Sequence, residues 1–256
     1  MSQFTQTNAH HERQPTVICI HGFLDNSSVW APLTDALRPE CAAVFTVNLR
    51  GAGDLRDSGG PYTLQQATAD VVGLIDQHDL HDIVLVGHSM GAQIAEMVAQ
   101  RRPRQIMAMV LMTPTPLAGN QLPADVVDFL RQSGANAATQ RSIREQFSCN
   151  LDQDTLERLT DACVMMGVEA VEGYFDAFST GDPSGLEPCT FCGPVLLIGA
   201  ESDPVIPASA VRQARETRYR LSELVMIPRS GHWPHLEQPR ETATAIIRFL
   251  QGADLL

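Results

Sequence analysis

A serine stands at the centre of residues 87–91, which read Gly-His-Ser-Met-Gly. The pattern G-x-S-x-G is typical of a sharp turn from a strand into a helix, where the serine has strained backbone geometry and the flanking glycines let the chains pass. An apolar strand-like run at 83–86 precedes the motif, and an apolar helix-like run at 92–101 follows it. This context predicts that Ser89 is a nucleophile exposed above a sheet, with the backbone N–H of Met90 pointing at the same spot.

A serine nucleophile needs a base, and the base needs a group that orients it. Among the eight histidines, His232 is the first to follow the final strand-like run, and a glycine precedes it. It can therefore lie over the strand ends, and we predict that it is the base of Ser89. His235 follows three residues later and is expected to pack beside Trp233. The other histidines are set aside by their positions: His10 and His11 in the N-terminal tail, His78 and His81 at the opposite edge of the sheet, His88 pointing away from Ser89, and His21 shaping a loop.

The orienting acid is expected in one of two loops that follow the next strand-like runs. Residues 113–116 contain no carboxylate, whereas residues 199–207 offer Glu201 and Asp203. Asp203 precedes a proline at the apex of its loop, and Glu201 is still close to the strand. We therefore predict Asp203 as the acid, which gives the chain order Ser89, Asp203, His232 expected for this type of turn.

The elements that must position these residues follow a strand–helix rhythm. Continuous apolar runs of this length are typical of strands buried on both faces of a parallel sheet. Between about residues 116 and 188 the rhythm stops and only helix-like segments remain, so we predict an α/β fold, a mostly parallel doubly wound sheet with a helical insertion. The strands are expected at 16–20, 43–47, 83–86, 106–112, 195–198 and 224–227, the helices at 28–37, 63–78, 92–101, 209–218 and 240–250, and the inserted helices at 125–132, 142–147, 155–166 and 168–177.

The composition excludes several classes of function. All 18 basic residues are Arg and none is Lys, so a Schiff base with pyridoxal phosphate, a Ser-Lys dyad and a lysine-containing phosphate-binding loop are excluded. The net charge of −12 argues against nucleic acid or an anionic membrane as a partner. No apolar run approaches the roughly 18 residues of a membrane span. Residues 1–14 are polar, so we expect a flexible tail without a signal peptide and a cytoplasmic location.

Two of the six cysteines have the spacing C-x-x-C, at Cys189 and Cys192. This spacing occurs in redox and zinc sites, but no second cysteine pair or nearby histidine completes a ligand set here. We therefore expect a pair of free thiols, and we expect the protein to use neither a metal nor a cofactor.

The triad order and the nucleophile turn resemble those of the α/β-hydrolase superfamily, and the resemblance extends from residue 16 to residue 250. By this resemblance, Ser89 matches the nucleophile, Asp203 the acid and His232 the base. Phe23, which follows His-Gly, matches the residue whose backbone N–H joins that of Met90 in an oxyanion hole. The resemblance also implies a hydrolase core at 15–115 and 189–256, with residues 116–188 as a helical cap.

The chain departs from the family pattern in three places. Residues 48–55 read Asn-Leu-Arg-Gly-Ala-Gly-Asp-Leu where the family often has Asp-x-Arg-Gly-His-Gly-x-Ser. Ala92 stands where a second glycine is usual. Only about fifteen residues precede the first strand, so the leading β-hairpin of the family is expected to be short or missing.

The resemblance implies acyl transfer to Ser89 and hydrolysis of the acyl-enzyme. We predict a small-molecule substrate, an uncharged carboxylic ester or lactone of small to medium size. C–C bond hydrolases, thioesterases, enol-lactonases and perhydrolases on the same triad are alternatives, and a hydrolase-fold ligand receptor with slow turnover is the non-enzyme alternative. The sequence gives no indication of the oligomeric state. Seven large apolar residues of the insertion could line an apolar pocket, although most are expected to pack internally: Phe129, Phe147, Met165, Met166, Tyr174, Phe175 and Phe178.

Overall fold

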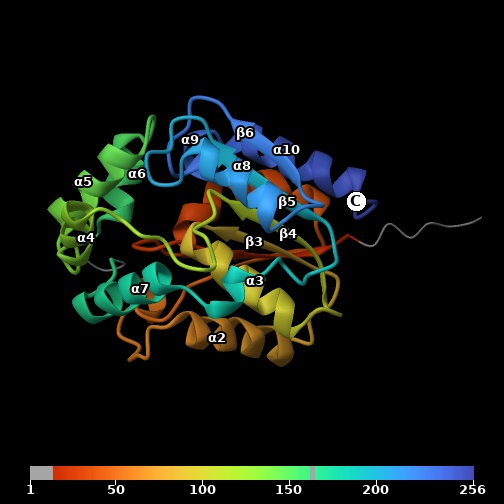
Figure 1. The fold of residues 1–256 in the computed structure, drawn as a ribbon, viewed down its shortest axis with the longest axis horizontal. Coiled ribbons are helices and arrows are strands. Elements are labelled where there is room, and N and C mark those ends of the chain that lie inside the picture. The colour runs from red at the N-terminus through yellow and green to blue at the C-terminus, as the bar shows by residue number, and fades with distance from the viewer. Residues whose placement is uncertain (1–13, 162–164) are drawn as a thin grey trace, which may run out of the picture.

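A single six-stranded sheet forms the centre of the computed structural model, which describes residues 14–161 and 165–256 (Figure 1). The strand order is β2-β1-β3-β4-β5-β6, and all five neighbouring pairs are parallel. The strands are β1 (Thr16–Ile20), β2 (Ala43–Val47), β3 (Ile83–His88), β4 (Ile106–Met112), β5 (Val195–Ala200) and β6 (Glu223–Ile227). The predicted α/β class with a parallel sheet is therefore confirmed. The predicted tail lies almost entirely outside the described residues.

The strands are continuous apolar runs because both faces of the sheet are covered. In β1, Val17 and Cys19 point into one core cluster, whereas Ile18 and Ile20 point into the other, and all four are fully buried. Successive side chains of the strand point to opposite faces of the sheet, and both faces are buried. The unbroken apolar sequence predicts this, because a strand with one solvent-exposed face would alternate apolar and polar residues.

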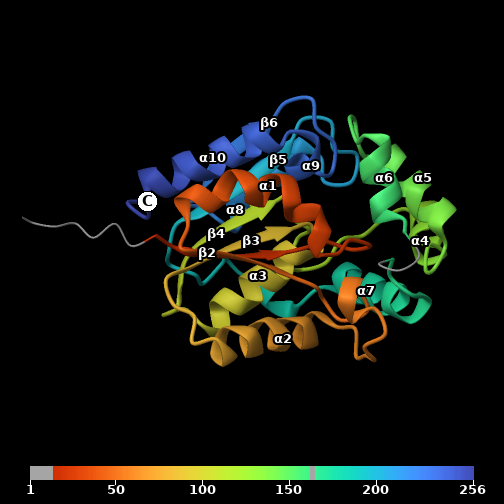
Figure 2. The same cartoon turned by 180° about the vertical axis from the view of Figure 1, so that it is seen from behind.

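Helices form a layer on each side of the sheet, as Figures 1 and 2 show from opposite sides. One layer contains α1 and α10, whose residues Leu33 and Ile246 are fully buried in one core cluster. The other contains α2, α3 and α8, which contribute Ile94 and Val211 to the second cluster. The helices of the two layers are α1 (Ala31–Leu37), α2 (Leu64–Gln77), α3 (Met90–Arg101), α8 (Ala208–Thr217) and α10 (Pro239–Gly252). A short helix, α9 (Pro234–Glu237), precedes α10, and 3-10 turns lie at Ser27–Trp30, Arg38–Glu40, Gly53–Leu55 and Pro183–Leu186.

The segment between β4 and β5 contains α4 (Ala124–Arg131), α5 (Ala137–Phe147), α6 (Gln153–Leu159) and α7 (Val168–Thr180). Both views place α4, α5 and α6 together beyond one end of the sheet (Figures 1 and 2). Within the described residues this segment contains no strand, as predicted. Its division from the core as a separate cap remains a prediction.

Three of the inserted helices differ from the prediction by more than one residue. The helix expected at 168–177 continues to Thr180. The helix expected at 142–147 begins earlier, at Ala137, because the side chain of Asn136 accepts the N–H of Thr139 and caps the first turn. The helix expected at 155–166 is shorter, since α6 ends at Leu159 and the backbone of the next residue, Thr160, leaves the helical conformation with φ of −108° and ψ of 12°. Residues 162–164 of that expected helix lie outside the described residues.

The direction in which successive strands are added to the sheet reverses between β1 and β3. From β1 the chain goes to the edge strand β2 on one side, and from β3 it goes to β4 on the other side. Loops that follow the two central strands diverge at such a point and leave a crevice at the carboxyl ends. Helix α3 begins at this crevice and approaches β1 very closely. A Cβ atom on Gly91 would lie 2.2 Å from the Ile20 carbonyl oxygen and 2.7 Å from that of His21.

Among the described residues, no helix is both long and apolar enough to span a membrane.

The close approach at Gly91 predicts that Gly91→Ala destabilises the protein by about 1–3 kcal/mol, because backbone atoms cannot move aside as a flexible side chain can. Gly73→Ala is the matched control, since Gly73 lies in α2 and a Cβ there meets nothing within 4 Å. It should instead stabilise the fold by about 0.5–1 kcal/mol through a better helix propensity. Urea unfolding of the two variants and the wild type measures both effects. Equal stability of the two variants would contradict the packing argument.

Candidate active site

Ser89 occupies a strained turn between β3 and α3. Its φ of 52° and ψ of −118° lie in a region that L-residues rarely adopt, at a cost of about 1–3 kcal/mol. A Cβ on Gly87 would lie 2.4 Å from the Gly91 carbonyl oxygen. Both glycines of the motif are therefore required by close backbone contacts, as the pattern predicts.

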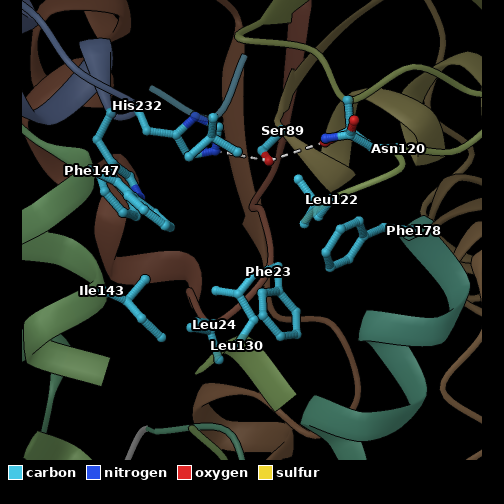
Figure 3. A pocket seen from close by; sticks show the side chains of 13 residues that line it. Phe23, Leu24, Ser89, Asn120, Leu122, Leu130, Ile143, Phe147, Phe178 and His232 are labelled. Atoms are coloured by element: carbon cyan, nitrogen blue, oxygen red, sulfur yellow. Dashed lines mark hydrogen bonds between the residues drawn. The ribbon is translucent and has the colours of Figure 1, made fainter. Parts of the chain in front are cut away.

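His232 lies within hydrogen-bond distance of both Ser89 and Asp203 (Figure 3 shows Ser89 and His232). His232 Nε2 is 3.0 Å from Ser89 Oγ, and His232 Nδ1 is 2.8 Å from Asp203 Oδ2. The carboxylate fixes the tautomer: Nδ1–H donates to Asp203, so Nε2 accepts the serine proton. The other oxygen of Asp203 accepts the backbone N–H groups of Val205 and Ile206, at 2.8 and 3.0 Å.

The surroundings of His232 favour its charged form. Burial alone would lower the pKa of His232, but the Asp203 carboxylate raises it by charge and by hydrogen bonding, with further contributions from Asp25 and Glu237, so that the pKa lies above its ordinary value. Asp203 is itself buried, whereas Glu201, the alternative acid, is exposed to solvent. The structure thus brings Asp203 and not Glu201 to the histidine.

The backbone of His232 is fixed on both sides. Its N–H donates to the Phe147 carbonyl at 2.7 Å. Its carbonyl accepts His88 Nε2 at 2.7 Å and the Thr113 hydroxyl at 3.1 Å. The sequence predicts only that the side chain of His88 points away from Ser89. In the structure His88 holds the loop that carries His232. No local pattern indicated this contact, because the two residues are far apart in the chain.

Glu237 stabilises the same loop, and sequence reasoning missed it. Its carboxylate accepts the backbone N–H groups of Gly231 and Trp233, on either side of His232, at 2.9 and 3.1 Å. It also accepts those of Cys149 and Asn150, between α5 and α6, at 2.7 and 3.1 Å. One nearly buried side chain therefore joins the His232 loop to the inserted segment.

His10 and His11 lie outside the described residues, and His21 and His235 make contacts with residues other than Ser89. His21 Nε2 accepts the N–H of Leu49 at 3.1 Å and so shapes the loop after β1, as predicted. The prediction that His235 packs beside Trp233 needs correction: its ring stacks on Trp30, with 4.5 Å between the ring centres. Trp30 offers a flat apolar face there, and burial lowers the pKa of His235 well below its ordinary value, so the ring is neutral.

The two residues predicted to supply the oxyanion donors, Phe23 and Met90, lie near Ser89. A Cβ on Gly22 would be 3.1 Å from the Cβ of Ser89, so the chain passes directly by the serine just before Phe23. Met90 is the first residue of α3, and its N–H therefore has no acceptor within the helix. The Phe23 ring packs against Phe178 of α7, with 5.1 Å between ring centres, which fixes this loop from the side of the insertion.

A largely apolar pocket of about 480 Å³, including its open mouth, ends at Ser89 and His232 (Figure 3). Of the seven large apolar residues considered above, two line it, Phe147 and Phe178. The other five pack internally, so most do so as expected: Phe129, Met165, Met166, Tyr174 and Phe175. Thr115, whose hydroxyl is 3.3 Å from Ser89 Oγ, was not foreseen. The remaining lining residues are Phe23, Leu24, Asn120, Leu122, Leu130, Ile143, Val205 and Trp233.

Cys189 and Cys192 carry free thiols, away from this pocket. Burial and the Glu96 carboxylate raise the pKa of Cys189 to about 12, so the group is protonated at neutral pH. In residues 14–161 and 165–256, no group of three or more His, Cys, Asp or Glu side chains is arranged to hold a metal ion.

A parallel sheet with a nucleophile turn at its switch point, and an acid and a histidine on later loops, defines the α/β-hydrolase class. The sequence profile of the alpha/beta hydrolase family matches residues 17–245, so the chain belongs to this family. A candidate 2-succinyl-6-hydroxy-2,4-cyclohexadiene-1-carboxylate synthase of Bacillus subtilis (strain 168) is 25% identical, over 91% of this chain and 89% of its own. An sn-1-specific diacylglycerol lipase of Mus musculus is 24% identical, over 92% and 81%.

A bromoperoxidase from Bacillus anthracis has a similar structure, with a TM-score of 0.82 at 21% identity, covering 94% of this chain and 93% of its own. This likeness supports the fold alone. The expectation of a hydrolase is confirmed at the level of enzyme class. The names of these proteins give different activities, so the substrate must be inferred from the site.

Glu237→Ala is expected to lower the free energy of unfolding by at least about 2 kcal/mol, because it leaves backbone N–H groups buried without an acceptor. Glu241→Ala in α10 is the control, since Glu241 is exposed. Thermal unfolding measures both changes. If the Glu237 variant were as stable as the Glu241 variant, the carboxylate would not be holding the His232 loop.

Proposed function

We propose that this protein hydrolyses uncharged carboxylic esters or lactones of small to medium size, through an acyl-enzyme on Ser89. The observation that carries the proposal is the hydrogen-bonded series Ser89–His232–Asp203 at the end of an apolar pocket. A serine–imidazole–carboxylate series of this kind has no packing rationale, whereas it supplies each group that acyl transfer needs.

Acylation begins when Ser89 Oγ attacks the carbonyl carbon and its proton passes to His232 Nε2. The carbonyl oxygen becomes an oxyanion, which the backbone N–H groups of Phe23 and Met90 would hold; such a donor contributes about 3–4 kcal/mol. The C–O bond of the ester then breaks, and His232 returns the proton to the leaving alcohol. In a lactone the alcohol stays attached to the acyl group.

Deacylation repeats the sequence with water as the nucleophile. His232 Nε2 removes a proton from water, the hydroxyl attacks the acyl carbon, and the proton passes to Ser89 Oγ as the acid is released. Asp203 keeps the imidazole oriented throughout and stabilises its charged form. No metal, cofactor or redox partner is needed for either half.

The pocket supports an uncharged, apolar substrate. Its lining is mainly Phe and aliphatic side chains, and no Arg is among them. The net charge of −12 disfavours polyanionic substrates in addition. Ile143, Phe147 and Phe178 reach the pocket from α5 and α7, which supports the proposal that residues 116–188 act as a cap over Ser89.

The mouse relative, a diacylglycerol lipase by name, supports ester cleavage over cleavage of a C–C bond. Steady turnover distinguishes an enzyme from a receptor that binds the ligand and releases product slowly. Hydrolysis of p-nitrophenyl esters of increasing acyl length, with a lactone and a thioester beside them, therefore tests the class of substrate directly.

Ser89→Ala should lower kcat for p-nitrophenyl butyrate by at least about 10⁴-fold, since loss of the nucleophile removes the acyl-enzyme route. Ser209→Ala, at an exposed position of α8, serves as the control and should keep wild-type rates. Both are measured by steady-state release of p-nitrophenol. Full activity of the Ser89 variant would refute the proposal.

The activity of the wild-type protein is expected to rise with pH, because only the neutral imidazole of His232 can accept the serine proton. Burial lowers the pKa of His232, but nearby carboxylates, Asp203 foremost, raise it above the ordinary 6.5. The acid limb of kcat/KM should therefore lie at higher pH than the titration of a histidine in a short peptide. A pH–rate profile checks this, and a limb at lower pH would show that the carboxylates do not act on His232.

A further inference from the structure

A second buried carboxylate, besides that of Asp203, acts on His232. Asp25 follows Phe23 by two residues in the loop after β1, and its side chain is fully buried. Its Oδ2 accepts the indole N–H of Trp233 at 3.0 Å and lies 3.6 Å from His88 Nδ1. Asp25 has no role in the acyl transfer described above, which uses Ser89, His232 and Asp203.

Trp233 and His88, which lie next to the Asp25 carboxylate, both adjoin the backbone of His232. Trp233 is the next residue, and its ring is fixed by the hydrogen bond to Asp25. His88 Nε2 donates to the His232 carbonyl, and the opposite nitrogen of the same ring faces Asp25. Asp25 therefore acts on the placement of His232 through its hydrogen bond to Trp233, and it also lies against His88 Nδ1, which has no hydrogen-bond partner among the described residues.

A buried cation compensates the charge of Asp25. Arg144 of α5 is completely buried, and its Nη2 is 3.3 Å from Asp25 Oδ1. The same Nη2 donates to the Leu24 carbonyl at 2.6 Å, and Nη1 donates to that of Gln140 at 3.2 Å. The cation from the inserted segment thus holds the loop that carries Phe23 as well as the acid.

Stability alone gives little reason for such a pair. Taking two charges out of water costs several kcal/mol per ion, and apolar residues of similar volume often replace a buried pair without loss. A pair that fixes a geometry needed for function is the better-supported reading here, because its contacts converge on the His232 and Phe23 loops.

We propose that Asp25 is a second acidic positioning residue for His232, beside Asp203, and that Arg144 compensates its buried charge. The proposal rests on the proposed function in so far as His232 is the base of Ser89. In energetic terms Asp25 stabilises the imidazolium that forms during acyl transfer, while its contacts with Trp233 and His88 keep the ring on line with Ser89.

Several charged or titratable groups face His232, and the test must separate them. Besides Asp25 they are Asp203 from the loop after β5, Glu237 and His235 from α9, and His88 at the end of β3. Contacts with His88, Arg144 and Trp233 hold the pKa of Asp25 well below its ordinary value despite burial, so Asp25 is charged at every pH of interest. Removing this one negative charge should lower the pKa of His232 and leave Asp203 and Glu237 in place.

The experiment is an NMR titration of the His232 ring in the wild type, in Asp25→Asn and in Asp25→Asn/Arg144→Met, with a His232→Gln spectrum for assignment. The double variant removes both charges and therefore avoids an unpaired buried Arg144 if the single variant folds poorly. Glu96→Gln is the matched control, because Glu96 also forms a buried ion pair with an arginine, Arg218, but lies outside the pocket. We expect the His232 titration to move to lower pH in both Asp25 variants and to stay unchanged in the control.

An unchanged His232 titration in the folded Asp25 variants would overturn the proposal and leave the pair a structural role only. The titration is independent of turnover, so a wild type that hydrolyses no ester would refute the proposed function without affecting this result. With an active wild type, kcat for p-nitrophenyl butyrate should fall by up to about 100-fold in the Asp25 variants, as for a small misplacement of a catalytic group, with little change in KM. A change in KM alone would also contradict a positioning role.

Discussion

The candidate active site depends on one imidazole ring that must hydrogen-bond to two partners at once. His232 has Ser89 on one nitrogen at 3.0 Å and Asp203 on the other at 2.8 Å. The three side chains come from loops after β3, β5 and β6, so the parallel sheet sets their spacing. A shift of one strand or loop by an ångström would break one of the two hydrogen bonds, and the serine would lose its base.

Buried polar contacts around the loops maintain this spacing. Phe147, His88 and Thr113 bond to the backbone of His232, and Glu237 bonds to the backbone on either side. Such contacts add modest net stability each, but leaving one partner unsatisfied is costly, so they act together to hold one arrangement. The contacts of Phe147 and Glu237 involve the inserted segment, which therefore helps to position the candidate site.

The strands, the turn and the three candidate residues could be predicted because local patterns determine them. Apolar runs mark buried strands, the glycines at 87 and 91 mark close backbone contacts, and few acids or histidines follow the later strands. The supporting residues could not be found in this way. Arg144 lies in a polar helix-like stretch that looks exposed in the sequence, and only packing against the distant Asp25 buries it.

The formation of an acyl-enzyme on Ser89 is tested most directly by peptide mass spectrometry. The protein is mixed with p-nitrophenyl acetate, the reaction is quenched with acid during turnover, and the peptides are analysed for acetyl groups. The account predicts one acetyl group on Ser89 in the wild type during turnover. Because the chain contains no lysine, acetylation of lysine side chains cannot obscure the result. Continued release of p-nitrophenol without acetylated Ser89, or with the acetyl group on another residue, would contradict the account.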